Sequence, residues 1–151
     1  MIDDTAGSAA EQLSALRALV ADGRGELAVI RLRRLLQGEP RSIEAQALLA
    51  STLLSLHQPE EALRSADAVV AAEPNNPEGH HLRARVLLQL GQASPALASS
   101  EAAVDREPLV PAYHKALVRA ALRCGALAAS FSNAAATTGI VATVVVPAFS
   151  G

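Results

Sequence analysis

The residues best able to do chemistry in this sequence are its four histidines and its lone cysteine. His80 and His114 could be a pair of metal ligands, but they lie 34 residues apart at equivalent positions of a repeat, which favours a packing role for both. His57 falls in a predicted turn, where solvent should surround it. Cys124 has no acid or base beside it in the sequence that would activate a thiolate. Glycine-rich phosphate loops and the HExxH and GxSxG motifs are absent, so we predict no catalytic, cofactor or metal site.

Two rows of basic and polar residues recur at helical spacing. The rows are His81, Arg85 and Gln89, and then Lys115, Arg119 and Arg123 at positions 34 residues further along. Residues four apart share one face of a helix, and the guanidinium group of arginine pairs well with carboxylates. We therefore expect a surface that receives an acidic segment or a free carboxylate of a partner. The alternative is a solvated basic face that binds no partner.

Composition limits the classes to which the chain can belong. Its 151 residues suit one domain with a sizeable core, and 50% of them are hydrophobic although only 2% are aromatic. The apolar residues are mainly Ala, Leu and Val, a helix-forming mixture whose thin side chains let helices approach closely. A net charge of −2 gives no global attraction to nucleic acid, and a single cysteine excludes an internal disulfide framework. The acidic N-terminus lacks the basic and apolar parts of a signal peptide, so we predict a cytoplasmic location.

The dipeptide Glu-Pro marks an internal repeat, because its prolines Pro40, Pro74 and Pro108 follow one another at intervals of 34 residues. This register divides the chain into windows 9–42, 43–76, 77–110 and 111–144. Other positions align in the same register: position 8 holds Leu16, Ala50, Ala84 and Val118, position 15 holds Gly23, His57, Gly91 and Gly125, and position 20 holds Ala28, Ala62, Ala96 and Ser130. Several columns in phase with the prolines indicate a true repeat.

Each full window carries the signals of two helices joined by a short turn. Glycine at position 15, as at Gly23, is favoured just past a helix end because it tolerates positive φ. The expected caps are Ser8 (in a capping box with Glu11), Ser42 and Asn76, and the expected first-turn prolines are Pro59, Pro77 and Pro111. In window three we expect Ser94 to cap a second helix that Pro95 opens. In window four we expect a second helix to begin at Gly125, in the stretch "GALAASFSNAAA".

These residues resemble the tetratricopeptide repeat family, whose unit has the same period, small residues at positions 8 and 20, and proline at position 32. The resemblance covers residues 9–124. It implies an all-α, right-handed solenoid of helical hairpins, with three 34-residue repeats plus a partial fourth. It also implies a non-enzymatic scaffold that binds other proteins. The sequence departs from the family at position 4, where an aromatic residue is frequent but this chain has Gln12, Gln46, His80 and His114.

The resemblance further implies where a partner would bind, because the first helices of such repeats line a concave groove. The groove residues predicted on this basis are Arg17, His81, Arg85, Gln89, Lys115, Arg119 and Arg123. The family's carboxylate clamp, with Lys and Asn at positions 5 and 9 of the first repeat, is absent, since Leu13 and Arg17 stand there. We therefore expect a protein or peptide partner of acidic character, but no chaperone-tail receptor of the clamp type.

A second basic cluster, "RLRRLL" at residues 31–36, lies on a predicted second helix. Second helices normally face solvent, and no aromatic residues interleave these charges to stack on bases. We expect a solvated face there and no nucleic-acid site.

The C-terminal part of the sequence breaks the pattern, because no Asp, Glu, Lys or Arg follows Arg123. We divide the chain into an N-terminal tail (1–8), the repeats (9–124) and an uncharged apolar segment (125–151). Four interpretations of this last segment stay open. The first is a membrane anchor over 126–146. The second is a segment that covers the last repeat or self-associates through "VATVVV". The third is a recognition tail, and the fourth is the end of a truncated or altered sequence. The alternative to a scaffold is thus a secretion-type chaperone or leader-like carrier whose tail is the functional element.

Overall fold

The structure is a computed structural model that describes the backbone of residues 7–138 and the side chains of residues 7–125. Within these residues it contains helices and no strands. In chain order the helices are α1 (Ala9–Ala21), α2 (Gly25–Gly38), α3 (Ile43–Ser55), α4 (Pro59–Ala72), α5 (Pro77–Gln89), α6 (Ala93–Arg106) and α7 (Pro111–Thr138). The predicted all-α architecture of helical hairpins is confirmed. The three windows from residue 9 to residue 110 each form one hairpin.

The turn inside each hairpin is built in the same way three times. Gly23, His57 and Gly91 have φ angles of 77°, 58° and 77°, in the left-handed region. In the first hairpin the N–H of Gly23 donates to Val20 O at 3.1 Å, and the N–H of Arg24 donates to Leu19 O at 2.9 Å. This pair of bonds is the Schellman arrangement, which needs a residue with positive φ just after the helix. Glycine adopts that conformation without strain, whereas His57 is a residue that rarely does so.

The joints between hairpins hold the predicted caps. Ser8 and Glu11 form the capping box, Ser42 Oγ accepts from Ala45 N–H at 3.4 Å, and Asn76 Oδ1 accepts from Glu78 N–H at 3.0 Å. These side chains satisfy N–H groups that have no partner within their own helix.

One predicted cap is wrong. The second helix of the third hairpin, α6, begins at Ala93, so Ser94 and Pro95 lie inside its first turn. Gln92 precedes it without a capping side chain. The reason is that the hairpin turn fixes where the next helix starts: Ala96 N–H donates to Gln92 O at 3.1 Å, as Ala62 N–H does to Gln58 O in the preceding hairpin. Pro95 is tolerated because the first N–H groups of a helix need no intrahelical acceptor.

Small residues lie where the two helices of a hairpin cross. Position 8 (Ala50, Ala84) and position 20 (Ala28, Ala62, Ala96) are all fully buried, with 0% exposure. Larger apolar residues, among them Leu32, Leu53 and Leu87, fill the space on either side. The alanines allow the helices to approach closely, and the leucines supply most of the apolar area that is removed from water.

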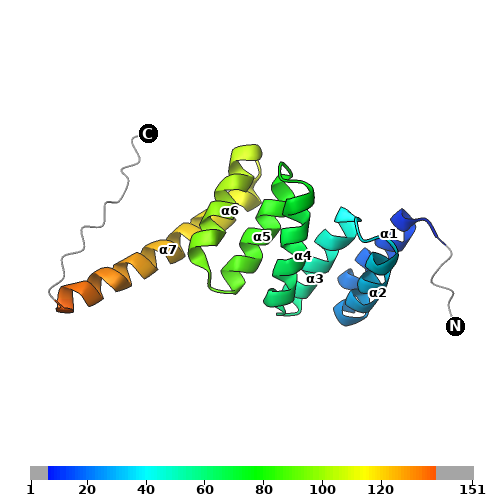
Figure 1. The fold of residues 1–151 in the computed structure, drawn as a ribbon, viewed down its shortest axis with the longest axis horizontal. Coiled ribbons are helices and arrows are strands. Elements are labelled where there is room, and N and C mark those ends of the chain that lie inside the picture. The colour runs from blue at the N-terminus through cyan, green and yellow to red at the C-terminus, as the bar shows by residue number, and fades with distance from the viewer. Residues whose placement is uncertain (1–6, 139–151) are drawn as a thin grey trace.

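The hairpins stack into a curved row. The backbones of the first helices approach one another in sequence (α1 with α3, α3 with α5, α5 with α7). Within residues 7–138 the backbones of the second helices stay further apart, although a side-chain ion pair joins α2 to α4. The first helices therefore lie on the shorter, inner side of the curve. Figure 1 shows the row running from α1 at one end to α7 at the other.

The fourth window does not form the predicted hairpin. α7 is one continuous helix of 28 residues, and Gly125 lies inside it rather than at a turn. After Gly23 and His57 the chain begins a new helix within two residues, and Pro59 favours the start of the second one. The four residues directly after Gly125 are the good helix formers Ala and Leu (126–129), with no proline or cap residue among them, so glycine alone does not break the helix. Figure 1 shows the C-terminal end of α7 running out beyond the other helices.

Residues 139–151 lie outside the described part of the chain, and so does the predicted "VATVVV" pairing segment. In the described residues we find no helix with the length and apolar character that a membrane span requires.

Candidate functional site

The inner helices at the C-terminal end of the solenoid carry both predicted rows. His81, Arg85 and Gln89 are on α5, and Lys115, Arg119 and Arg123 are on α7. α5 and α7 are in direct contact, so the structure brings the two rows onto neighbouring helices. Arg17 is not among them, because α1 contacts neither α5 nor α7. Its guanidinium group instead lies 3.7 Å from Glu44 on α3, in an exposed ion pair.

Two members of the rows are already engaged within the protein. Arg123 Nη1 donates to the backbone oxygen of Leu88 at 2.8 Å, at the C-terminal end of α5. The same carbonyl also accepts from the N–H of Gly91 at 3.2 Å, and a cation at this position complements the negative end of the helix dipole. Gln89 Nε2 lies 2.8 Å from Nδ1 of His57 in the turn between α3 and α4. These two side chains tie neighbouring repeats together, and His57 is not simply solvated.

Three cations remain available on this surface. The side chains of Arg85, Lys115 and Arg119 are exposed, and within the described part of the chain none of them forms an ion pair or a hydrogen bond. Two of them extend from α7 and one from α5, so they present positive charge from two adjoining helices. Carboxylate groups are the natural ligands for such a set, particularly for the forked guanidinium groups.

A cluster of three residues joins α5 to α7 beside these cations. The rings of His81 and Tyr113 are 4.9 Å apart between centroids and tilted by 43°. The hydroxyl of Tyr113 donates to Oε2 of Glu78 at 3.1 Å. Tyr113 is only 4% exposed, and Nδ1 of His81 is buried without a hydrogen-bond partner in the described residues. This cluster positions the first turns of both helices.

The surroundings shift the ionisation of two members of the cluster. Burial lowers the pKa of His81; the negative charge of Glu78 opposes this, and the positive charge of Arg85 adds to it. Burial together with the charge and hydrogen bond of Glu78, with a further contribution from Glu107, raises the pKa of Tyr113 to about 12. His81 therefore favours its neutral form, and Tyr113 keeps its proton as a hydrogen-bond donor.

Sequence reasoning missed Tyr113, which no predicted row contains. The signal that could have found it is its uniqueness, because it is the one tyrosine of a chain with very few aromatic residues. Its position at the start of α7 places it opposite the start of α5. Only the contact between the two helices identifies His81 and Glu78 as its partners.

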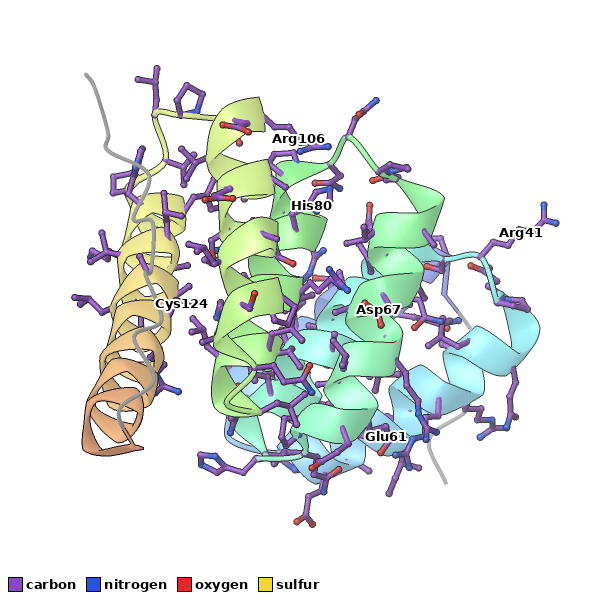
Figure 2. The ribbon with its side chains drawn as sticks, turned by 60° about the vertical axis from the view of Figure 1, so that its left-hand side comes forward. Arg41, Glu61, Asp67, His80, Arg106 and Cys124 are labelled. Atoms are coloured by element: carbon purple, nitrogen blue, oxygen red, sulfur yellow. The ribbon has the colours of Figure 1, made fainter. Side chains whose placement is uncertain are left out.

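The two histidines at position 4 form a repeated joint. His80 Nε2 lies 2.7 Å from the backbone oxygen of Pro74, and His114 Nε2 lies 2.6 Å from that of Pro108. Each side chain thus bonds to the proline that ends the preceding repeat; Figure 2 shows His80 at the N-terminal end of α5. His114 is exposed, so the prediction that it fills a packing position is wrong. Its role is a hydrogen bond to the joint.

Other polar groups lie elsewhere in the solenoid. In the "RLRRLL" cluster on α2, Arg33 forms an ion pair with Glu61 on α4. A surface hollow is lined by Glu39, Pro40, Arg41 and Ser42, in the loop between α2 and α3, and contains none of the predicted groove residues. The described residues hold no group of three or more His, Cys, Asp or Glu side chains arranged to bind a metal.

The architecture defines a class: a solenoid of helical hairpins with small residues at the helix crossings and its first helices on the inner face. Comparison with known proteins gives the family. Residues 19–86 match the family profile described as tetratricopeptide repeat. This part of the chain consists of tetratricopeptide repeats.

Solved structures share the fold. The chain is similar to MamA (41-end) from Desulfovibrio magneticus RS-1, with 24% identity over 86% of this chain and 74% of that one and a TM-score of 0.72. It is similar to the first tetratricopeptide domain of Spaghetti (RPAP3) bound to the HSP90 peptide SRMEEVD, with 14% identity over 74% and 89% and a TM-score of 0.71. It is also similar to PcrH in complex with the chaperone binding region of PopD, with 23% identity over 86% and 98% and a TM-score of 0.66. Comparison with curated protein sequences gives no match.

Proposed function

We propose that this protein is a non-enzymatic interaction scaffold that binds an acidic peptide segment of a partner across α5 and α7. The observation that carries the proposal is the set of three exposed cations, Arg85, Lys115 and Arg119, on two helices in contact. Within the described residues, no carboxylate of the chain itself forms an ion pair with them.

Electrostatics favour such a ligand. Like charges on neighbouring helices repel one another, and a bound carboxylate removes this repulsion while forming charge-assisted hydrogen bonds. Glu78, the acidic residue of the cluster, accepts a hydrogen bond from the hydroxyl of Tyr113 and forms no ion pair with these cations in the described residues. The inner face therefore offers positive charge at Arg85, Lys115 and Arg119 beside a neutral, fixed His81–Tyr113 pair.

The structural neighbours supply further support. One of them is bound to a peptide, SRMEEVD, that contains three acidic residues, and another is bound to a region of PopD. These complexes belong to those proteins, but they indicate that this fold can bind a peptide or a segment of a partner. In the present chain the cations lie in the third and fourth repeats rather than in the clamp positions of the first.

A direct binding measurement tests the proposal. A dye-labelled peptide of alternating glutamate and leucine is titrated with the full chain, and its counterpart with lysine in place of glutamate is titrated in parallel. We expect the glutamate peptide to bind more tightly, with an affinity that falls as salt is added. The double variant Arg85→Glu with Arg119→Glu should weaken this binding by at least about tenfold, because each reversed charge now repels the ligand.

The matched control reverses two exposed arginines outside the surface, Arg41 and Arg64. Figure 2 shows Arg41 projecting from the loop between α2 and α3, and Arg64 lies on α4. The control variant should bind the glutamate peptide with nearly the affinity of the unchanged protein. Equal binding of both peptides, or equal loss in the two variants, would contradict the proposal. A pull-down with mass spectrometry that compares the unchanged protein with the Arg85/Arg119 variant then identifies the natural partner.

A chaperone or carrier role is the second candidate, and the likeness to PcrH bound to a region of PopD favours it. In that case the segment after Gly125 is itself functional. A scaffold keeps its partner when residues 126–151 are removed, whereas a carrier loses its function. A carrier should also show a processed C-terminus when its intact mass is measured in cells.

A further inference from the structure

The exposed side of α7 carries an apolar pair directly beside two of the exposed cations. The pair is Val118 and Leu122, which are 57% and 69% exposed. Going around the helix, Val118, Leu122, Lys115 and Arg119 follow one another in that order within an arc of about 100°. Arg123 comes next in this direction and bonds to a backbone oxygen of α5, so Arg119 lies toward α5 and Val118 lies away from it. A surface one helix wide therefore offers two apolar side chains next to two cations.

The apolar pair stands at positions 8 and 12 of its repeat, and in the internal repeats other helices cover these positions. Ala50, at position 8, is 0% exposed and shares a core cluster with Ala66 of α4 and Leu82 of α5. Leu88, at position 12, is 4% exposed and shares a core cluster with Ala96 of α6. Within residues 7–138 only α5 and α6 pack against α7. The side of α7 that carries the pair is thus equivalent to a surface that helices cover elsewhere in the row.

The other end of the row is built differently. Of the large apolar side chains that the described part of the chain exposes, none is on α1, whose exposed residues include Ser14 and Ala18. A polar outer face of this kind is what the terminal repeat of a solenoid needs to stay soluble. α7 instead exposes Val118 and Leu122, a difference that favours a contact surface at this end. Figure 2 shows α7 at the end of the row, with α6 beside it.

We propose that the partner segment binds as an amphipathic helix along the exposed side of α7, an inference that rests on the function proposed above. The apolar residues of this helix pack on Val118 and Leu122. Acidic residues along one edge of its apolar face pair with Lys115 and Arg119, on the side where Arg85 of α5 also lies. The partner then supplies a helix at repeat positions that the protein's own helices cover in the internal repeats.

Charge complementarity determines the chemistry of this occupant. Lys115 and Arg119 form no ion pair or hydrogen bond within the described part of the chain. A purely apolar segment would cover these cations without giving them a partner, and a purely acidic one would place carboxylates against Val118 and Leu122. A helix with an acidic row beside an apolar row matches both pairs, because residues three and four apart share a face in either helix.

Two peptides of the same composition test the helical arrangement. One is the alternating peptide of glutamate and leucine described above. The other contains the same residues in an order that places leucines three and four apart, with glutamates along the edges of that row. We expect the full chain to bind the ordered peptide at least about tenfold more tightly than the alternating one. Proline in place of a central glutamate of the ordered peptide should remove most of this advantage, because proline breaks a helix.

Substitutions on α7 test the apolar pair. The double variant Val118→Ser with Leu122→Ser should bind the ordered peptide about tenfold more weakly than the unchanged protein does, with little change for the alternating peptide. Both side chains are mostly exposed, so the variant should stay folded, which circular dichroism checks. The matched control is Ile30→Ser, because Ile30 is 62% exposed on α2, which contacts neither α5 nor α7. It should bind both peptides as the unchanged protein does.

The outcomes separate this inference from the function on which it rests. Equal binding of the ordered and alternating peptides, or a double variant that keeps the full affinity for the ordered one, would overturn the helical arrangement. The proposed function survives that result as long as glutamate peptides bind more tightly than their lysine counterparts. If glutamate and lysine peptides bind alike, both proposals fail.

Two other occupants of the apolar pair are tested with the same double variant. Sedimentation velocity of the full chain detects a second copy, and flotation with phosphatidylserine vesicles detects a lipid surface. We expect neither self-association nor vesicle binding that depends on Val118 and Leu122. A dimer, or a vesicle-bound form, that the double variant abolishes would assign the pair to that occupant and overturn the proposal.

Discussion

The imidazole ring of His81 lies against the phenol ring of Tyr113, with 4.9 Å between the ring centroids, and the two residues come from the first turns of α5 and α7. The pair joins the third repeat to the fourth window at the surface where we place the ligand. Because the contact buries Nδ1 of His81, it also makes the stability of this end of the solenoid dependent on pH.

The first prediction concerns that dependence. Burial lowers the pKa of His81 in the folded protein, while in the unfolded chain the histidine titrates near its ordinary value of about 6.5. Below that value the unfolded state binds the proton first, so the free energy of unfolding should fall as the pH is lowered from about 7 to about 5. His81→Phe keeps a ring against Tyr113 and removes the titration. Urea unfolding at both pH values should show that this variant loses less free energy of unfolding between pH 7 and pH 5 than the unchanged protein. An equal loss in the two proteins would assign the pH dependence to other groups.

The second prediction concerns the joints between repeats. His80 and His114 bond to the backbone oxygens of Pro74 and Pro108, and changing either to alanine should lower the free energy of unfolding by about 1 kcal/mol. Glutamine is the matched control, because Gln12 at the same repeat position makes a similar bond, to the backbone oxygen of Gly7 five residues earlier, at 3.1 Å. In thermal or urea unfolding, His80→Gln and His114→Gln should recover more than half of the stability that the alanine variants lose. A glutamine variant as unstable as the alanine variant would argue against the hydrogen bond.

The third prediction concerns the close approach of α4 and α5 at Gly79. A Cβ atom at this buried glycine would lie 3.0 Å from Cγ1 of Val69, so Gly79→Ala should lower the free energy of unfolding by about 1 kcal/mol despite the better helix propensity of alanine. Gly38→Ala is the control, because its added methyl group meets nothing within 4 Å and should be neutral or slightly stabilising. Combining Gly79→Ala with Val69→Ala should show favourable coupling between the two changes if crowding is the cause.

The fourth prediction concerns Arg83, which links three helices. Its Nε donates to Asp67 Oδ1 at 2.6 Å on α4, and its Nη1 donates to Ser99 Oγ at 3.0 Å on α6. Figure 2 shows Asp67 on α4. The pair with Asp67 is partly exposed and contributes little by itself, so Arg83→Ala should lower the free energy of unfolding by about 1 kcal/mol. Arg83→Lys should recover only part of this, because an ammonium group cannot reproduce the forked geometry. Full recovery by lysine would show that charge alone matters.

Much of the fold could be predicted from the sequence because its signals are local. A proline such as Pro74, a cap such as Asn76 and a glycine such as Gly91 act within a few residues, and their recurrence at 34-residue intervals defines the hairpins. The two errors about where helices begin and end also concern local signals. Ser94 looks like a cap, but the preceding turn had already fixed the helix start at Ala93. Gly125 looks like a helix end, but glycine permits a turn without requiring one.

The sequence by itself determined the repeat, the helices and the row of first helices on which the cations stand. The tertiary structure alone decided which of these side chains are hydrogen-bonded within the protein, because their partners are far away in the chain. Arg123 bonds to Leu88 O and Tyr113 bonds to Glu78, each across 35 residues, and Gln89 bonds to His57 across 32. Helix propensity and caps depend on near neighbours, whereas the partner of a side chain depends on which helices pack together. For that reason the sequence predicted seven groove residues, and the packing left three exposed cations among them, Arg85, Lys115 and Arg119, which we propose to be the ligand-binding set.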